Sequence, residues 1–206
     1  MQGEHTMFWD KVSGLYNLFE DIINGKVNRQ LCKEVADYIS STDKVLECAC
    51  GTGMITKVIA ARAKSVIATD YSIGMLKQTA KNCRKLANVK VRKADITNIK
   101  CKSNAFDKVV AGNVIHLLDN PNDALKELER VCKPGGQIII PTYVNKENTG
   151  KPNLFVTIMK VFGPVFKKHF TFESYQEFFE KSGYNNVEYT LVTGRIPCAI
   201  AVITKK

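Results

Sequence analysis

The sequence predicts an α/β fold with a mainly parallel sheet, one antiparallel strand and helices on both faces. From residue 45 to about residue 142, short apolar runs typical of strands alternate with helical patterns. Near the end of the chain, two strand-like runs at 186–192 and 198–203 follow one another directly, which indicates a β-hairpin. The alternation predicts the parallel part of the sheet, and the hairpin predicts the antiparallel strand.

The elements of the first half can be assigned in order. Residues 7–39 are amphipathic and predict two helices that are separated near Asn24-Gly25. The first strand begins at Val45 and ends at Glu47, and a glycine turn and a helix pattern follow it at once. Further strands are expected at 65–70, 89–96 and 106–113, with a helix from Gly74 onward between the first two.

The second half begins with a helix that Pro121 opens at its first turn, where a missing N–H costs nothing. The segment 131–140 is expected to end this helix, turn at Pro134–Gly136 and open a fifth strand. A polar loop covers 144–150, and 154–162 is a short apolar helix or turn. Thr171 is a suitable N-cap for a helix over 172–181 that ends at Gly183, and the hairpin follows.

The segment Glu47-Cys48-Ala49-Cys50-Gly51-Thr52-Gly53 is the most informative part of the chain. Ligands of open α/β sheets bind outside the carboxyl ends of the strands, and glycines let the backbone approach a ligand closely. The start of the next helix offers free N–H groups and a positive dipole end. A dinucleotide fingerprint would need a third glycine at Thr56, and the phosphate-loop motif is absent.

Polar residues also end the following strands. Asp70 lies roughly 20 residues beyond the glycine turn, where a ribose-binding acid is expected. Asp95 lies at the end of the third predicted strand, and Asn113 lies at the end of the fourth. Because the carboxyl ends of parallel strands meet at one edge of a sheet, these residues are expected to surround one site.

In this order and spacing, residues 40–145 resemble the successive motifs of the class I S-adenosylmethionine-dependent methyltransferase superfamily. The segment 11–17 resembles the amino-terminal tyrosine segment of its small-molecule branch, the ubiquinone/menaquinone-type or "methyltransferase type 11"-like enzymes. The departures are Ala49 in place of the motif's first glycine and Glu rather than Asp at position 47. The resemblance implies a Rossmann-like seven-stranded sheet with the last strand antiparallel, and S-adenosylmethionine as the methyl donor.

The resemblance also implies how the chain holds the methionine part of the donor. Glu47 would bind the amino end, directly or through water. The turn with Ala49, Gly51 and Gly53 would let the backbone approach, and the backbone at Asn113 would face the methionine moiety.

For the nucleoside part, the resemblance implies that Asp70 accepts hydrogen bonds from the ribose hydroxyls. Tyr71 would lie along the adenine, and Asp95 would accept from its exocyclic amine with Ile96 beside it. Tyr16 would close over the cofactor or, alternatively, be a core aromatic of an amphipathic helix.

Methyl transfer from a sulfonium needs no obligatory catalytic group, because the methyl group is already activated and the protein mainly positions and desolvates it. His116 is the histidine nearest to the expected methyl position, and it could accept a proton from the acceptor. The alternative is a structural histidine in the loop.

The resemblance and the element order predict a single methyltransferase domain over 1–206. Its expected parts are an N-terminal helical cap (1–40), a cofactor-binding core (41–142), a lid insertion (143–170) and a C-terminal helix with hairpin (171–206). No long apolar run predicts a membrane span, and the polar start is unlike a signal peptide. Seven cysteines without metal spacing indicate a reducing compartment, so we expect a cytoplasmic protein without a metal site.

The net charge of +10 and the basic stretch 77–108 raise the possibility of a nucleic-acid substrate. However, Asn113-Val114-Ile115-His116 lacks the prolines and the aromatic residue that amino-group nucleic-acid methyltransferases carry after the fourth strand. A non-catalytic cofactor-binding scaffold is a third hypothesis, against which the series of acids and glycines argues. The expected acceptor is therefore a small, partly apolar molecule rather than a nucleic acid. The sequence does not determine the oligomeric state, although a monomer is compatible with it.

Overall fold

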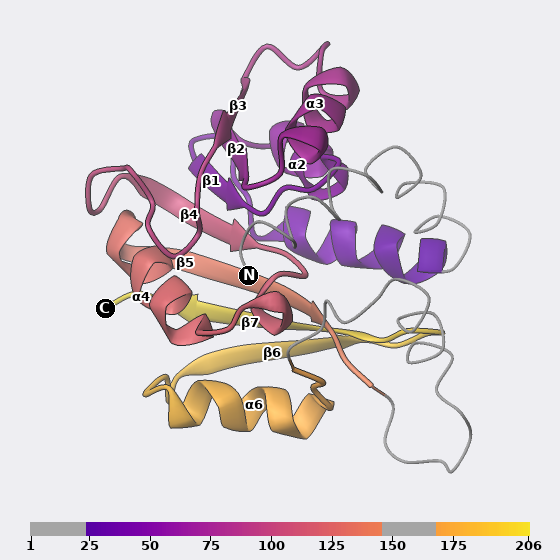
Figure 1. The fold of residues 1–206 in the computed structure, drawn as a ribbon, viewed down its shortest axis with the longest axis vertical. Helices are drawn as coiled ribbons and strands as arrows, with labels where there is room; N and C mark the ends of the chain where they lie inside the picture. Colours follow the sequence, from indigo (N-terminus) through magenta and orange to yellow (C-terminus); the bar gives the residue numbers. More distant parts are fainter. Residues whose placement is uncertain (1–23, 146–167) are drawn as a thin grey trace.

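The structure is a computed structural model that describes residues 24–145 and 168–206. Its seven strands form one sheet in the order β3-β2-β1-β4-β5-β7-β6 (Figure 1). β7 runs antiparallel to both of its neighbours, and all other neighbouring strands are parallel. The predicted fold class is therefore confirmed, including the single antiparallel strand near the end of the chain.

The strands are β1 (Lys44–Cys48), β2 (Ser65–Asp70), β3 (Val89–Lys93), β4 (Phe106–Ala111), β5 (Cys132–Tyr143), β6 (Val187–Val192) and β7 (Cys198–Thr204). The helices are a helix over 24–37, α2 (Met54–Ala60), α3 (Ile73–Asn82), the 3-10 helix η1 (Ile115–Leu117), α4 (Pro121–Val131) and α6 (Phe172–Lys181). No helix in these described ranges is both long and apolar enough to span a bilayer.

Helices cover both faces of the sheet, and each strand contributes to two cores. Neighbouring side chains on a strand point to opposite faces. In β1, Val45 belongs to the apolar cluster that contains residues of the helix over 24–37, α2 and α3, whereas Leu46 belongs to the cluster that contains residues of α4 and α6. The central strands are thus buried on both sides, which explains their nearly continuous apolar sequences.

Local signals placed several helix ends correctly. Pro121 occupies the first turn of α4. The Thr171 hydroxyl accepts a hydrogen bond from the backbone N–H of Ser174 at 3.2 Å and caps α6. Gly183 follows α6 with a φ of 92°, a left-handed conformation that suits glycine.

Three boundaries differ from the sequence prediction. The third strand ends at Lys93, before the predicted residue 96. The second predicted helix already includes Asn24-Gly25, since residues 24–37 are helical, and the helix predicted before it lies outside the described residues. Asn24 lies there because its side chain exchanges hydrogen bonds with Ile196, before β7, at 2.9 and 3.2 Å.

The third difference concerns the start of β5. Pro134–Gly136 was predicted as a turn, but β5 begins directly after α4 at Cys132, with an irregular register against β4. The N–H of Gly135 donates to the carbonyl of Lys205 at 2.8 Å, and Lys205 donates back to Gly136 at 2.9 Å. Pairing with the distant C-terminus therefore draws this segment into the sheet.

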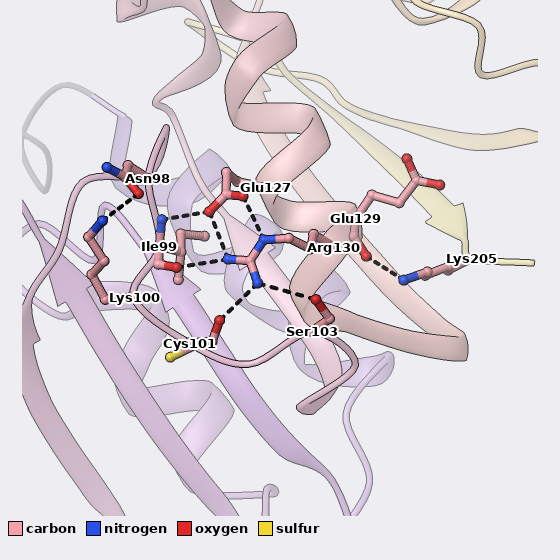
Figure 2. A network of polar contacts seen from close by, with 9 residues as sticks. All are labelled: Asn98, Ile99, Lys100, Cys101, Ser103, Glu127, Glu129, Arg130 and Lys205. Atoms are coloured by element: carbon pink, nitrogen blue, oxygen red, sulfur yellow. Dashed lines mark hydrogen bonds and ion pairs between the residues drawn. The ribbon is translucent and has the colours of Figure 1, made fainter.

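Arg130 on α4 holds the connection between β3 and β4 (Figure 2). Its guanidinium donates to the carbonyls of Ile99 and Cys101 at 2.8 Å and to the carboxylate of Glu127 at 2.6 and 2.8 Å. Glu127 in turn accepts from the N–H of Ile99 at 2.7 Å. These bonds fix the connection against α4, a few residues beyond Asp95.

Candidate active site

A cavity of about 420 Å³ lies at the carboxyl ends of the parallel strands. Its wall includes eight of the predicted cofactor residues, which are Glu47, Ala49, Gly51, Asp70, Tyr71, Asp95, Ile96 and Asn113. Gly53 lies next to this wall as the N-cap of α2, and Tyr16 lies outside the described residues. The fold therefore brings these groups together, while the contact that each makes with a cofactor stays a prediction.

The glycine turn between β1 and α2 uses left-handed backbone conformations. Ala49 and Gly51 have φ values of 55°, and Gly53 has a φ of 87°. The turn is held by a hydrogen bond from the Thr79 hydroxyl to the carbonyl of Gly51 at 2.7 Å. A side chain at Gly51 would meet only open space, so this turn leaves its inner surface free for a ligand. Ala49 carries conformational strain that a glycine would not have.

Asp70 ends β2 and holds the glycine turn. Its Oδ2 accepts from the N–H of Gly51 at 2.8 Å, and its Oδ1 accepts from the N–H of Ser72 at 2.9 Å. A carboxylate oxygen accepts more than one hydrogen bond, so these contacts leave capacity for ribose hydroxyls. The carboxylate is thus already oriented toward the cavity before any ligand binds.

Glu47 presents a buried carboxyl group in the cavity wall. Its side chain is 2% exposed, and its Oε2 has no hydrogen-bond partner in the described parts of the chain. Burial raises the pKa of Glu47 to about 8, the charge of Asp70 adds to this rise, and polar groups of Thr56 offset part of it. A cationic group would satisfy this oxygen and favour its ionised form.

The adenine end of the predicted site contains Asp95 and Tyr71. The backbone N–H and hydroxyl of Thr97 both donate to Asp95 Oδ1, at 2.8 and 2.7 Å. Tyr71 is 41% exposed at the rim, and the ammonium nitrogen of Lys93 lies 4.9 Å from the centre of its ring.

Asn113 lies where β4 ends. Its φ of 53° is unusual for a residue with a side chain, and its N–H donates to the carbonyl of Pro141 at 2.7 Å. The Oδ1 atom is buried and makes no hydrogen bond with any described residue. Strain and an unpartnered polar atom at a cavity wall are both typical of functional positions.

His116 lies in η1 and is 2% exposed. It is not among the described residues that line the cavity, although its neighbours Val114 and Leu117 are. Burial lowers the pKa of His116 to about 3, with a smaller contribution from His169. The imidazole is thus neutral at pH 7 and a weak base. Its role as a general base stays a prediction, and this burial favours the structural alternative.

The cysteines beside the glycine turn are protonated thiols. Burial is the main cause that raises the pKa of Cys48 to about 12 and that of Cys50 further. Across residues 24–145 and 168–206, no group of three or more His, Cys, Asp or Glu side chains could hold a metal ion. These thiols are therefore small packing groups rather than nucleophiles.

Sequence reasoning missed the groups that support the site. Thr56 lies buried near Glu47. Thr79 holds the glycine turn, and Thr97 holds Asp95. Asn82 donates to the carbonyl of Thr52 at 2.8 Å. None of these contacts follows a local sequence pattern, whereas Ser72, the N-cap of α3, is a residue type that marks helix starts. The apolar part of the wall was also not predicted as a set; it consists of Met54, Ile55, Met75, Val114, Leu117 and Leu118.

Comparisons with known proteins agree with this geometry. A family model for a methyltransferase domain matches residues 46–140. A demethylmenaquinone methyltransferase of Staphylococcus saprophyticus is 27% identical over 217 residues, covering 93% of this chain and 92% of that protein. One of Paenarthrobacter aurescens is 31% identical over 140 residues, covering 67% of this chain but only 54% of that protein.

Solved structures support the fold. An S-adenosylmethionine-dependent methyltransferase from Aquifex aeolicus superposes with a TM-score of 0.63 at 21% identity, covering 85% of this chain and 89% of that chain. At this identity the similarity is evidence for the fold alone. The family model and the sequence relatives carry the family assignment.

Proposed function

Because the chain belongs to the class I S-adenosylmethionine-dependent methyltransferases, we propose that it methylates a small, partly apolar, quinone-like acceptor. The observation that carries this proposal is the single cavity wall that combines the acid–glycine series with an apolar side. The names of the relatives support a quinone-like ring as the acceptor.

The residues present fit the methyl donor. S-adenosylmethionine supplies a methyl group on a positively charged sulfur, which needs no further activation. The unpartnered Oε2 of Glu47 suits the cationic amino end of this molecule. The open space beside Gly51 lets the donor approach the protein backbone closely. Asp70 offers an acceptor for the ribose hydroxyls, and Asp95 offers one for the adenine amine.

The apolar side of the cavity suits the acceptor. Ile55, Val114, Leu117 and Leu118 would pack against an aromatic ring and exclude water from the reacting atoms. Methylation of a ring carbon or a hydroxyl also releases a proton, which water or a nearby base must take. The chain's main contribution is thus alignment and desolvation.

A nucleic-acid acceptor is the second candidate, because the chain carries a net charge of +10. The lining after β4 does not favour it, since Val114, Leu117 and Leu118 are aliphatic and offer no aromatic ring on which a flipped base could stack.

The test is transfer of a labelled methyl group to a panel of quinols, phenols, thiols and amines, with RNA and DNA as alternative acceptors. We expect turnover with a reduced quinone-like compound and none with nucleic acid. Transfer to RNA alone would support the second candidate, and cofactor binding without any turnover would support a scaffold.

The donor site is tested by calorimetric titration. Asp70→Ala should weaken S-adenosylmethionine binding by about 1–3 kcal/mol, because buried polar partners lose their acceptor. Asp37→Ala, which changes an exposed carboxylate paired with Arg62, is the matched control. Since Asp70 also holds the glycine turn, thermal unfolding of each variant must be measured alongside. If wild type and a folded Asp70→Ala variant bind S-adenosylmethionine with equal affinity, the ribose assignment is contradicted. In the same titration, NAD should not bind to the wild-type protein.

A further inference from the structure

We propose that the protein docks on anionic phospholipid membranes through the basic end of its sheet. We call this surface the β3 end; it consists of β3, α3 and the exposed residues up to Lys102. Residues 77–102 contain nine Lys or Arg and one acid, Asp95, so they account for a net charge of 9 − 1 = +8 out of +10. All nine cations are exposed, and they are Lys77, Lys81, Arg84, Lys85, Lys90, Arg92, Lys93, Lys100 and Lys102.

None of these nine cations forms an ion pair within the described chain, although the charge of Lys100 helps to lower the pKa of the nearby Glu127. Each ion pair found there joins other residues, such as Arg62 with Asp37 or Lys133 with Asp107. The positive charge of the β3 end is therefore available to an external anionic surface.

The cations surround an open sheet edge. β3 pairs only with β2 among the described strands and ends the sheet (Figure 1). Val89 and Val91 pack toward the core beneath α2 and α3, so Lys90 and Arg92 project from the opposite face. Lys77 and Lys81 add charge on the exposed side of α3.

Exposed apolar side chains lie beside this charge. In the described ranges only Tyr71, Ile73 and Leu191 are large hydrophobic residues with more than a third of their surface exposed. Two of them, Tyr71 and Ile73, lie at the start of α3, and Lys93 stacks on the Tyr71 ring at 4.9 Å. An aromatic ring, an aliphatic side chain and lysines are the groups that bind at the interface of a bilayer.

The described residues of α6 and β6 carry net negative charge. They expose Glu173, Glu177, Glu180 and Glu188 against Lys181, and the ammonium of Lys168 lies 5.3 Å from the centre of the Phe178 ring on α6. The β3 end and α6 lie at the two ends of the longest axis in Figure 1. This separation of charge would orient the β3 end toward a negative surface.

A membrane fits these features better than a nucleic acid does. Seven of the nine cations are lysines, whereas base and phosphate recognition favours the forked guanidinium of arginine. The exposed Ile73 suits lipid and gains nothing from a phosphate backbone. Tyr71 also lines the cavity, so the docked face adjoins its rim. Docking at this face would place the cavity rim close to an apolar acceptor dissolved in the membrane. This delivery of the acceptor rests on the proposed function, whereas docking itself does not.

The experiment is co-sedimentation of the full chain with vesicles of phosphatidylcholine alone or mixed with phosphatidylglycerol. We expect binding only to the anionic vesicles, with a loss at high salt because exposed charges are screened. The double variant Lys77→Gln/Lys81→Gln should lower the partition coefficient about thirty-fold. The matched control Lys126→Gln/Lys181→Gln removes two exposed lysines from α4 and α6 and should bind like wild type.

A second pair of variants tests the apolar contribution. Ile73→Ser should weaken vesicle binding, whereas Leu191→Ser, at a similarly exposed position on β6, should not. The proposal is overturned if wild type does not distinguish the two vesicle types, if both lysine pairs matter equally, or if RNA binds and vesicles do not.

Turnover separates this proposal from the proposed function. The lysine variants should methylate a water-soluble acceptor at the wild-type rate. If no acceptor is methylated while vesicle binding follows the expected pattern, the proposed function fails and docking stands.

Discussion

At the scale of single residues, Glu47 should link cofactor binding to proton release. Its pKa of about 8 keeps the ligand-free carboxyl protonated at neutral pH, and a cationic ligand favours the ionised form. Below pH about 8, affinity for S-adenosylmethionine should therefore rise roughly tenfold per pH unit. Calorimetry in buffers of different ionisation enthalpy measures the released proton.

Glu47→Gln is the matched control, because it keeps the size and polarity of the side chain but does not titrate. The same pH slope in both proteins would assign the proton to the ligand instead. The sign for stability is the opposite of the usual carboxyl: a raised folded-state pKa means that folding is weakened as pH rises from about 4.5 to about 8. The Gln variant should lose this dependence.

Ala49 is expected to tolerate glycine unusually well. Its left-handed φ of 55° costs about 1–2 kcal/mol, whereas glycine costs about 0.5–1 kcal/mol through the unfolded chain. Ala49→Gly should thus leave the free energy of unfolding unchanged or raise it by up to about 1.5 kcal/mol. Ala80→Gly within α3 is the control and should lower it by about 1 kcal/mol. Equal destabilisation by both changes in denaturant unfolding would contradict the strain.

A variant of His116 can distinguish a structural role of this residue from a role as general base. With its pKa lowered to about 3 by burial, the neutral imidazole contributes stability above pH about 6.5 that is lost as pH falls toward 3. We expect His116→Gln to lower the free energy of unfolding and to leave the pH–rate profile unchanged above pH about 6.5. A kcat reduced by about 10²–10⁴ with unchanged thermal unfolding would instead support the general base.

At the scale of elements, the Arg130 contacts join α4 to the connection after β3 (Figure 2). Arg130→Met should lower the free energy of unfolding by about 1–3 kcal/mol, because the carboxylate of Glu127 and two carbonyls lose their donor. Lys126→Met, whose ammonium lies 4.0 Å from Asp123 on the exposed side of α4, should have almost no effect.

The ion pair between Arg130 and Glu127 also predicts that the stability of the protein depends on pH. Arg130 is the main cause that lowers the pKa of Glu127, so the stabilisation is present above the usual carboxyl pKa and lost as pH falls below it. Chemical unfolding at pH 7 and in mild acid measures the difference. If Arg130→Met shows the wild-type dependence on pH, the ion pair does not stabilise the connection.

At the scale of the whole molecule, sheet order predicts a gradient of stability. β1, β4 and β5 have neighbours on both sides and are covered by helices on both faces, so their amides should exchange most slowly with solvent. Amides on the outer edge of β3 should exchange much faster, since no described strand pairs with them. Hydrogen-exchange mass spectrometry checks this, and protection of β3 equal to that of β4 would reveal a partner on that edge.

The sequence alone determined the features that neighbouring residues encode. The β1–turn–α2 unit has the acid, the glycines and the helix pattern within about a dozen residues, and Pro121 and Thr171 mark helix starts by their own chemistry. The spacing of Asp70 and Asp95 after strand-like runs placed both in the cavity wall, because parallel strands share one carboxyl edge.

Only the tertiary structure decided the rest, because it depends on contacts between residues far apart in the chain. Lys205 draws Gly135 into β5, Ile196 binds Asn24, and Thr79 holds Gly51, none of which leaves a periodic signal in the sequence. The raised pKa of Glu47 and the lowered pKa of His116 also arise from burial by several elements together. Burial is a property of the packed sheet and helices, so the same side chains in an isolated segment would titrate normally.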